Sequence, residues 1–367
     1  MNDPKLQTIH GEPSLTLRSD CVRAWLAPRG GMLGPVEFTL PGGRMVQPYS
    51  LSPWYPAEFA KSQPSLLQVL RGDFFCFPFG SDATSPQPHG PTANETWAIS
   101  RAEPTVAELS LASEHPRAKV GKRVTLRAGE TNLYQEHTII ADGRYNFGHH
   151  PILHIPYGHT AEVRISPFRF GGVYRAPGGP PAGERFALEP GARFTAMDAV
   201  PLAAGGAGSL RQYPIRPSTE DIVMFAGFEG PHAWTAVTLD GFVWFSLRRT
   251  ADFPGTLFWM SNGGRDAAPW NGRHTRRIGV EDVCSHFCDG LEISTRDLLA
   301  AEHIPTSRLF KAGESVRLPH VQGVVEVPSI FGAVAVLEPV PGSTTRARLR
   351  SERGAIATFP LDWSFLA

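Results

Sequence analysis

The residues best suited to do chemistry in this chain begin at position 71. Residues 71–80 read RGDFFCFPFG, and a histidine then stands on a Pro/Gly turn in Pro88-His89-Gly90. Short apolar runs that end in such turns are typical of β-strands. This order can place Arg71 and His89 at neighbouring strand ends that face one cavity.

A second group of candidates is the set of histidines His149, His150 and His154. Histidine titrates near neutral pH, so it can donate or accept a proton. A lone histidine would most simply hydrogen-bond the backbone in a turn. Three histidines within a few residues make His150 a candidate for proton transfer as well.

Two adjacent carboxylates follow a late apolar run, in residues 277–283 (RIGVEDV). A carboxylate at the end of such a run is partly desolvated, which raises its basicity. The alternative is an exposed acid paired with Arg276 or Arg277. Successive residues of a strand point to opposite faces, so only one of Glu281 and Asp282 can face a given cavity.

The elements that must position these residues are strands. Thirty-seven glycines and thirty-four prolines separate short runs rich in β-branched and aromatic residues. These runs are residues 120–126, 133–140, 222–228, 234–239, 242–247 and 256–260. Residues 234–239 alternate as a half-buried strand would, 242–247 are continuous as in a strand covered on both faces, and only 294–303 indicate a short helix. The pattern predicts an all-β fold, a large antiparallel β-sandwich.

The chain shows no internal repeat of fixed period, which disfavours a propeller. The Gly/Pro-rich stretches 176–183 and 202–209 interrupt the strand pattern without a change of composition, as surface loops do. We therefore expect a single domain over residues 1–367.

Composition excludes several classes of partner. Thirty-five basic residues balance thirty-five acidic ones, so no field of one sign would attract nucleic acid or an anionic membrane. No segment approaches the ~20 apolar residues of a membrane span. The first residues lack the basic start and apolar core of a signal peptide, which favours a cytoplasmic protein. The sequence does not indicate an oligomeric state.

The four cysteines are too few for a disulfide framework. Cys284 and Cys288 flank His286, but their spacing is unusual for a metal site and no second pair lies nearby, so buried thiols are the preferred interpretation. We find no phosphate-binding loop, nucleophile elbow or dinucleotide fingerprint. We therefore expect no metal and no cofactor.

The order of these stretches resembles the galactose mutarotase superfamily, which includes aldose 1-epimerases and hexose-6-phosphate epimerases. Its members carry Arg-Gly-Gly, a Pro-rich aromatic run ending in Phe-Gly, and His-Gly before a tryptophan, here Trp97. Residues 22–33 (VRAWLAPRGGML) are similar to the opening hairpin of the family. The resemblance implies a β-sandwich of the galactose mutarotase-like type and a small-molecule sugar as ligand.

The resemblance also implies an activity, the interconversion of sugar anomers by ring opening with a general base and a general acid. It assigns Glu281, in preference to Asp282, as the base and His150 as the acid. His89 would orient the sugar near its ring oxygen or C1 hydroxyl. The alternative function is a carbohydrate-binding protein on the same fold that does not turn substrate over.

For substrate binding, the resemblance suggests Arg71 for hydroxyls or an anionic group and Asp221 as an acid. Trp270 is a candidate to stack on a sugar face, and so is Trp259, for which core packing is the alternative. One departure concerns phosphate. Ala93 stands where hexose-6-phosphate epimerases carry an arginine, so a bidentate phosphate clamp is missing there.

Overall fold

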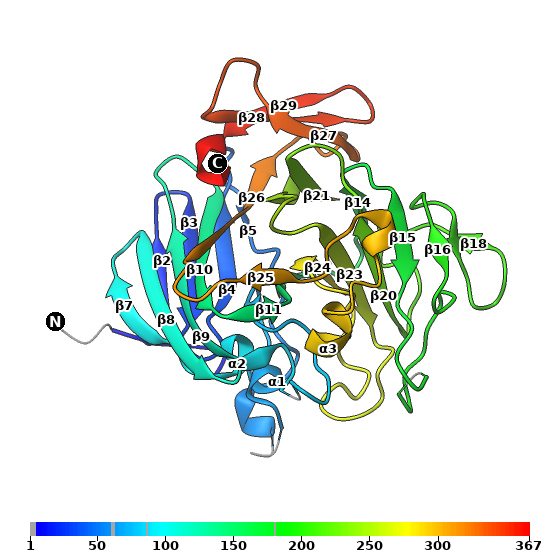
Figure 1. Ribbon diagram of the computed structural model, residues 1–367. Helices are drawn as coiled ribbons and strands as arrows, with labels where there is room; N and C mark the ends of the chain where they lie inside the picture. The colour runs from blue at the N-terminus through cyan, green and yellow to red at the C-terminus, as the bar shows by residue number, and fades with distance from the viewer. Residues whose placement is uncertain (1–4, 60–62, 86, 180) are drawn as a thin grey trace.

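The computed structural model describes residues 5–59, 63–85, 87–179 and 181–367, and β-strands dominate it (Figure 1). Strands in the two large sheets pair antiparallel. The six runs that composition marked as strands all form strands, so the predicted all-β class is confirmed. The predicted hairpin over residues 22–33 is also present, because its two arms pair across a turn that contains Gly30 and Gly31, both with positive φ.

The larger of the two main sheets carries nine strands in the described part of the chain. Their order across the sheet is β19 (Gln212–Tyr213), β14 (Ala161–Ile165), β21 (His232–Leu239), β22 (Phe242–Arg249), β26 (Val316–Glu326), β10 (Asn132–Ala141), β9 (Arg117–Thr125), β8 (Val106–Glu114) and β7 (Ala98–Ala102).

The other main sheet carries the candidate site, and it has eight strands in the described residues, seven of which form one path. Their order is β16 (Arg193–Phe194), β15 (Phe170–Val173), β20 (Thr219–Ala226), β23 (Gly255–Asn262), β24 (Arg277–Cys284), β12 (Phe147–His149) and β6 (Phe75–Cys76), with β13 (Ile152–His154) also paired to β24.

Smaller sheets surround these two. They are β1 (Gln7–Ile9), β2 (Glu12–Arg18), β3 (Val22–Ala27), β4 (Met32–Thr39) and β5 (Met45–Val46); β11 (Gly143–Tyr145) with β25 (Arg308–Phe310); β17 (Val200–Pro201) with β18 (Ala207–Gly208); and β27 (Val334–Pro339), β28 (Arg346–Ser351) and β29 (Ile356–Pro360).

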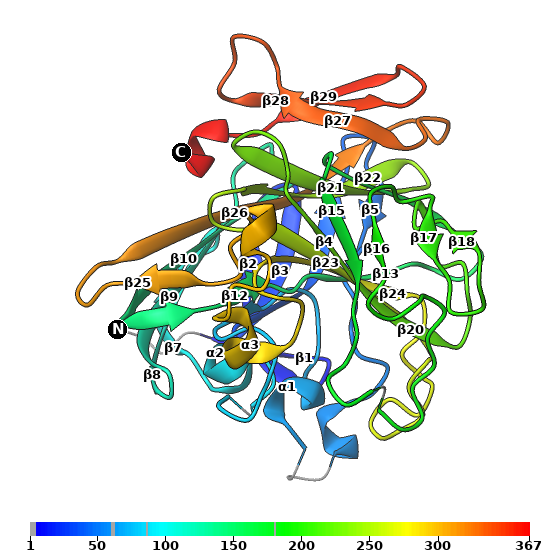
Figure 2. The same cartoon turned by 45° about the vertical axis from the view of Figure 1, so that its right-hand side comes forward.

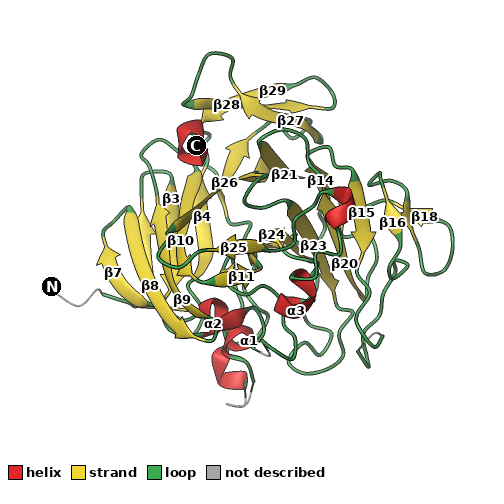
Figure 3. Ribbon diagram, in the orientation of Figure 1, coloured by secondary structure: helices red, strands yellow, loops and turns green. Residues whose placement is uncertain are grey.

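Helices are short throughout the described residues (Figure 3). They are η1 (Pro56–Glu58), α1 (Ser65–Gln68), α2 (Gly90–Asn94), α3 (Gly290–Ser294), η2 (Ala300–Glu302) and η3 (Trp363–Leu366). None of them is long and apolar enough to cross a membrane. The predicted helix over residues 294–303 is present only as the short 3-10 helix η2: α3 ends where the predicted helix should begin, and Asp297 adopts a positive φ that interrupts a right-handed helix.

The two main sheets face each other across the main apolar core, and each strand alternates between this core and its opposite face. In β24, Ile278 and Val280 point into the main core, whereas Val283 belongs to a second apolar cluster on the outer face of the sheet. Because the alternation has a period of two, Glu281 shares the outer face with Val283. Asp282 points inward, towards the nine-stranded sheet.

A buried polar network crosses the core between the main sheets, and Asp73 lies at one end of it. Its carboxylate accepts hydrogen bonds from the side-chain amides of Gln135 (2.6 Å) and Gln322 (2.7 Å), and its Oδ2 lies 3.1 Å from Nδ1 of His149. Burial opposes the ionisation of Asp73, but interactions with His149 and Lys122 outweigh burial and hold its pKa well below the usual range. Asp73 is therefore an anion in the core.

Asp282 forms the other end of this network. Its Oδ2 lies 2.8 Å from Nε2 of His320, its Oδ1 lies 3.0 Å from Nη1 of Arg248, and it accepts a 2.8 Å hydrogen bond from the Thr256 hydroxyl. The rings of His149 and His320 stack with centroids 4.1 Å apart. This stack joins the two carboxylates into one network.

The charges in this network balance. Two carboxylates, Asp73 and Asp282, are matched by the buried cations Arg248 and Lys122. The ammonium group of Lys122 donates a 2.8 Å hydrogen bond to the Gly31 carbonyl, and burial lowers its pKa to about 8 although Asp73 acts in the opposite direction. An isolated ion in such a place would be very costly, so this neutrality allows the charged groups to remain inside.

The sheet β27–β29 covers part of the outer face of the nine-stranded sheet, and it lies at the top of both Figure 1 and Figure 2. Trp234 and Ala236 of β21 pack with Leu337 and Leu349 of this small sheet. Residues 234–239 are consequently buried on both faces, which corrects the prediction of a half-buried strand. The continuous run 242–247 is buried on both faces as predicted.

We expect Asp282→Asn to lower the free energy of unfolding by about 3–5 kcal/mol, because it leaves Arg248 buried without its carboxylate. Arg248→Met in the same chain removes the stranded cation, so the double variant should regain much of the loss. Urea unfolding of both single variants and the double variant measures this coupling. Strictly additive losses in the double variant would contradict an ion pair between these two residues.

Candidate active site

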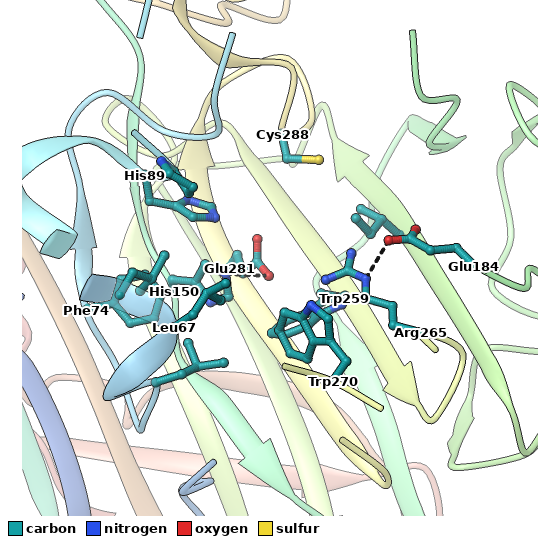
Figure 4. Close-up of a pocket in the computed structure, with 14 residues that line it drawn as sticks. Leu67, Phe74, His89, His150, Glu184, Trp259, Arg265, Trp270, Glu281 and Cys288 are labelled. Atoms are coloured by element: carbon teal, nitrogen blue, oxygen red, sulfur yellow. Dashed lines mark ion pairs between the residues drawn. The ribbon is translucent and has the colours of Figure 1, made fainter. Parts of the chain in front are cut away.

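A cavity of about 330 Å³ lies over the outer face of the eight-stranded sheet (Figure 4). Trp259 of β23 and Glu281 of β24 reach it from the sheet, and Leu66 and Leu67 of α1 line one side of it. Figure 4 shows Arg265 and Glu184 on the side opposite Leu67. A mostly apolar cavity with a few convergent polar groups is typical of a small-molecule site.

Glu281 is the most deeply buried acid in this cavity, with 3% of its surface exposed. Its Oε1 lies 3.2 Å from Nε2 of His150. Burial raises the pKa of Glu281 well above its ordinary value, and the more distant positive charge of Arg265 opposes this only in part. Gly279 makes room for the carboxylate, because a Cβ atom there would lie 2.5 Å from Oε1.

His150 follows β12 and is fixed through its backbone. Its N–H donates to the carbonyl of Phe74 (2.9 Å) and lies 3.1 Å from Oδ1 of Asp73. Its ring stacks on Phe74 with centroids 4.5 Å apart. Burial lowers the pKa of His150 well below the ordinary value, and His89 lowers it further.

Burial therefore disfavours both charged forms in this pair. Of the arrangements with one proton, burial favours a protonated Glu281 beside a neutral His150. The alternative arrangement, a carboxylate beside an imidazolium, differs from it only by a proton transfer within the pair. A pair that holds one proton in total can serve as an acid and a base at the same time.

His89 faces the same cavity from the turn before α2. The Gly80 N–H donates a 3.3 Å hydrogen bond to Nδ1 of His89, so the neutral ring carries its proton on Nε2. The ring lies 4.9 Å from that of His150, centroid to centroid, and burial lowers the pKa of His89 to about 4. His89 is thus a neutral hydrogen-bond donor beside the proton-transfer pair.

The side of the cavity opposite α1 is built around Arg265. Its guanidinium carbon lies 4.9 Å from the ring centroid of Trp270 and 5.6 Å from that of Trp259. Its Nε lies 2.9 Å from Oε1 of Glu184 and 3.4 Å from Oε1 of Glu220. This group combines aromatic faces with hydrogen-bond donors and acceptors.

Glu220 is almost completely buried at the base of this group. It accepts hydrogen bonds from the indole N–H of Trp259 and from the hydroxyl of Ser261, the latter at 2.9 Å. Burial raises its pKa to about 7, with Arg265 acting in the opposite direction. Glu184, Glu220 and Arg265 were not among the residues predicted from the sequence. Strand alternation could have found Glu220, because it lies two residues from Ile222, which lines the cavity and faces the same side of β20.

Two predicted binding residues lie elsewhere. Asp221 points away from the cavity that holds Glu281, because it is adjacent to Glu220 on β20, and its carboxylate accepts backbone hydrogen bonds from Ala187 (3.0 Å) and Leu188 (2.9 Å). Arg71 does not line the cavity either. Its fully buried guanidinium donates to the carbonyls of Val69, Ile9 and His10, which gives it a structural position between chain segments.

The other predicted residues are brought together. The cavity lining contains Glu281, His150, His89 and Trp270, together with Trp259. Asp282 is excluded from it by the alternation of β24. The roles assigned to these residues stay predictions, whereas their common location is a property of the fold.

The segment that carries the cysteines contributes one of them to the cavity. Cys288 lines it, and burial raises the pKa of this thiol to about 12. Cys284 points to the core and its thiol is directed to the Pro305 carbonyl. In the described ranges, no three His, Cys, Asp or Glu side chains form a group that could hold a metal ion.

Several solved structures that share this architecture are named as galactose mutarotase or aldose epimerase relatives. A galactose mutarotase related enzyme from Lactobacillus acidophilus aligns with a TM-score of 0.56 and 12% identity, covering 86% of this chain and 98% of that one. An aldose epimerase homologue from C. elegans gives 0.56 and 14%, covering 86% and 99%. A galactose mutarotase-like protein from Lactobacillus casei gives 0.54 and 14%, covering 85% and 99%. The chain therefore has the galactose mutarotase-like fold.

The likeness is visible in structure rather than in sequence. No protein-family model matches the chain, and neither does any curated protein sequence.

We expect the imidazoles of His89 and His150 to stay neutral well below the ordinary histidine pKa of about 6.5, because burial lowers both values. Histidine ¹³C and ¹⁵N NMR shifts followed from about pH 8 down to about pH 4 measure this. His89→Asn and His150→Asn identify the two sets of signals. Titration of His89 near its ordinary pKa, or a proton on its Nδ1, would contradict the geometry described here.

Proposed function

We propose that this protein interconverts the α and β anomers of an aldose by opening and closing the sugar ring. The observation that carries the proposal is the buried Glu281–His150 pair, 3.2 Å apart, beside the donor His89 in a cavity with aromatic walls. The galactose mutarotase-like fold supports it, since related structures are named as mutarotase or epimerase relatives. Fold alone does not define an activity, so the proposal depends on this pair.

The reaction requires only proton transfers and the rupture of one carbon–oxygen bond. The Glu281 carboxylate accepts the proton of the C1 hydroxyl while the His150 imidazolium donates a proton to the ring oxygen. The bond between C1 and the ring oxygen breaks, which gives the open-chain aldehyde. Rotation about the C1–C2 bond exposes the other face of the carbonyl, and reversal of both transfers closes the ring as the other anomer.

Burial of the pair favours this reaction coordinate. Proton transfer to Glu281 and from His150 converts two charged groups into two neutral ones, which is the state that the desolvated cavity prefers. The pair therefore stabilises the state that accompanies the open-chain sugar. His89 can donate from Nε2 to the C1 hydroxyl or the ring oxygen, and Trp270 offers a face for the apolar side of the ring.

The experiment that tests the function is NMR magnetisation transfer between the anomers of free aldoses, with and without catalytic amounts of protein. Saturation that passes from one anomeric proton to the other faster than in buffer demonstrates the enzyme. Chemical-shift changes without faster exchange would instead identify a carbohydrate-binding protein on the same fold.

We expect Glu281→Gln to reduce the exchange rate by roughly 10²–10⁴-fold, because glutamine keeps the size of the side chain but cannot accept the C1 proton. His150→Asn should cost a similar factor. The double variant should cost less than the product of the two, since the residues act as one proton-transfer unit.

The matched control for these variants is Glu229→Gln, which changes an exposed glutamate in the same way. Circular dichroism and thermal unfolding should show that the variants stay folded, and sugar binding should change little in Glu281→Gln. Near-normal exchange in Glu281→Gln would exclude Glu281 as the base.

We expect a bell-shaped dependence of the catalysed rate on pH, after subtraction of the spontaneous rate. As pH falls through the lowered pKa of His150 the pair gains a second proton and loses its base. As pH rises through the raised pKa of Glu281 the pair loses its proton and hence its acid. The acidic limb should therefore lie below about 6.5 and the alkaline limb well above about 4.3. A rate that rises steadily with pH would contradict a one-proton pair.

A further inference from the structure

A second cavity of about 280 Å³ adjoins the first. Six residues line both of them: Pro88, His89, Glu184, Ile222, Arg265 and Cys288. The two cavities are therefore lobes of one site, and the Arg265–Glu184 pair lies where they meet. Figure 4 shows this pair on the far side of the first lobe from Phe74.

The second lobe lacks the proton-transfer pair. Its lining includes neither Glu281 nor His150, although it shares His89 with the first lobe. A sugar ring that reacts must therefore occupy the first lobe. A single ring placed there leaves the second lobe vacant.

The lining of the second lobe has the chemistry of a carbohydrate subsite. Tyr174 and Phe186, both partly exposed, contribute aromatic rings that can stack on the C–H face of a pyranose. Arg265, Glu184 and Glu220 provide donors and acceptors close together, as two neighbouring hydroxyl groups require.

The charges favour an uncharged ligand. The guanidinium of Arg265 is already matched by Glu184 at 2.9 Å and faces Glu220 at 3.4 Å, so little positive charge remains to attract an anion. A neutral ring that hydrogen-bonds to these groups through hydroxyls needs no compensating charge.

We propose that the second lobe binds a second, neutral sugar ring, so that the substrate is the reducing end of a disaccharide or longer oligosaccharide. This rests on the proposed function, because ring opening requires a free C1 hydroxyl on the ring in the first lobe. The second ring must therefore be joined through another carbon of the reacting ring.

The test compares each free monosaccharide with disaccharides that end in it. Glucose is compared with maltose, cellobiose, lactose and isomaltose, and galactose with β-1,4-galactobiose, by anomer exchange in NMR. We expect at least one disaccharide to exceed its own reducing monosaccharide by tenfold or more in kcat/KM. Tyr174→Ala and Phe186→Ala should each reduce that ratio by about five- to tenfold, as loss of a stacking partner of roughly 1–1.4 kcal/mol predicts.

Tyr157→Ala is the control, since Tyr157 is a largely exposed tyrosine that lines neither lobe. It should leave the ratio unchanged. Faster exchange of the monosaccharides with no disaccharide preferred would overturn the second subsite while the proposed function stands.

Calorimetry separates the two proposals. Tighter binding of a disaccharide than of its monosaccharide, lost in Tyr174→Ala, supports the subsite even if no exchange is found, and the activity alone then fails. Equal binding of all these sugars in wild type and variants would exclude the subsite by a measurement that does not depend on turnover.

Discussion

The buried polar network of Asp73 and Asp282 positions Glu281 and His150. Each aspartate is the neighbour of a residue in the cavity wall: Asp282 follows Glu281, and Asp73 accepts the backbone N–H of His150. His149, the neighbour of His150, stacks inside the same network. Because adjacent residues of a strand face opposite ways, fixing the inner member fixes the outer one. The catalytic candidates are thus located by contacts on the other side of their own strands.

The two faces differ in how their charges are handled. The inner network is neutral as a whole, because its two carboxylates are balanced by two cations. Asp73, Asp282 and Lys122 also have hydrogen-bond partners. The outer pair, Glu281 and His150, has no such partners and is kept uncharged by burial. Apolar side chains in place of this pair would make the folded protein more stable. The poorly solvated acid and base therefore indicate a function that outweighs their cost in stability.

The strands and the all-β class could be predicted from the sequence, because runs of β-branched and aromatic residues are local signals. The segments with His89, His150 and Glu281 could be predicted from the order of their motifs along the chain. Facing was harder. Asp221 was chosen, whereas its neighbour Glu220 lies beside Arg265 and lines the adjoining lobe; a shift of one position along a strand turns a side chain to the opposite face. Arg71 is held by carbonyls from the first strands, and Arg265 reaches the site through a loop after β23. Neither contact leaves a trace in local sequence, since both join segments that only folding brings together.

The small sheet β27–β29 affects how the protein responds to local unfolding. It covers apolar side chains on the outer face of β21 and β22. In a two-layer sandwich this face is usually polar and exposed to solvent. Displacement of the small sheet would expose Trp234, Phe245 and their neighbours as a continuous apolar surface. An exposed apolar surface of this size promotes self-association. The small sheet therefore protects the outer face of one main sheet, whereas the cavity lies over the outer face of the other.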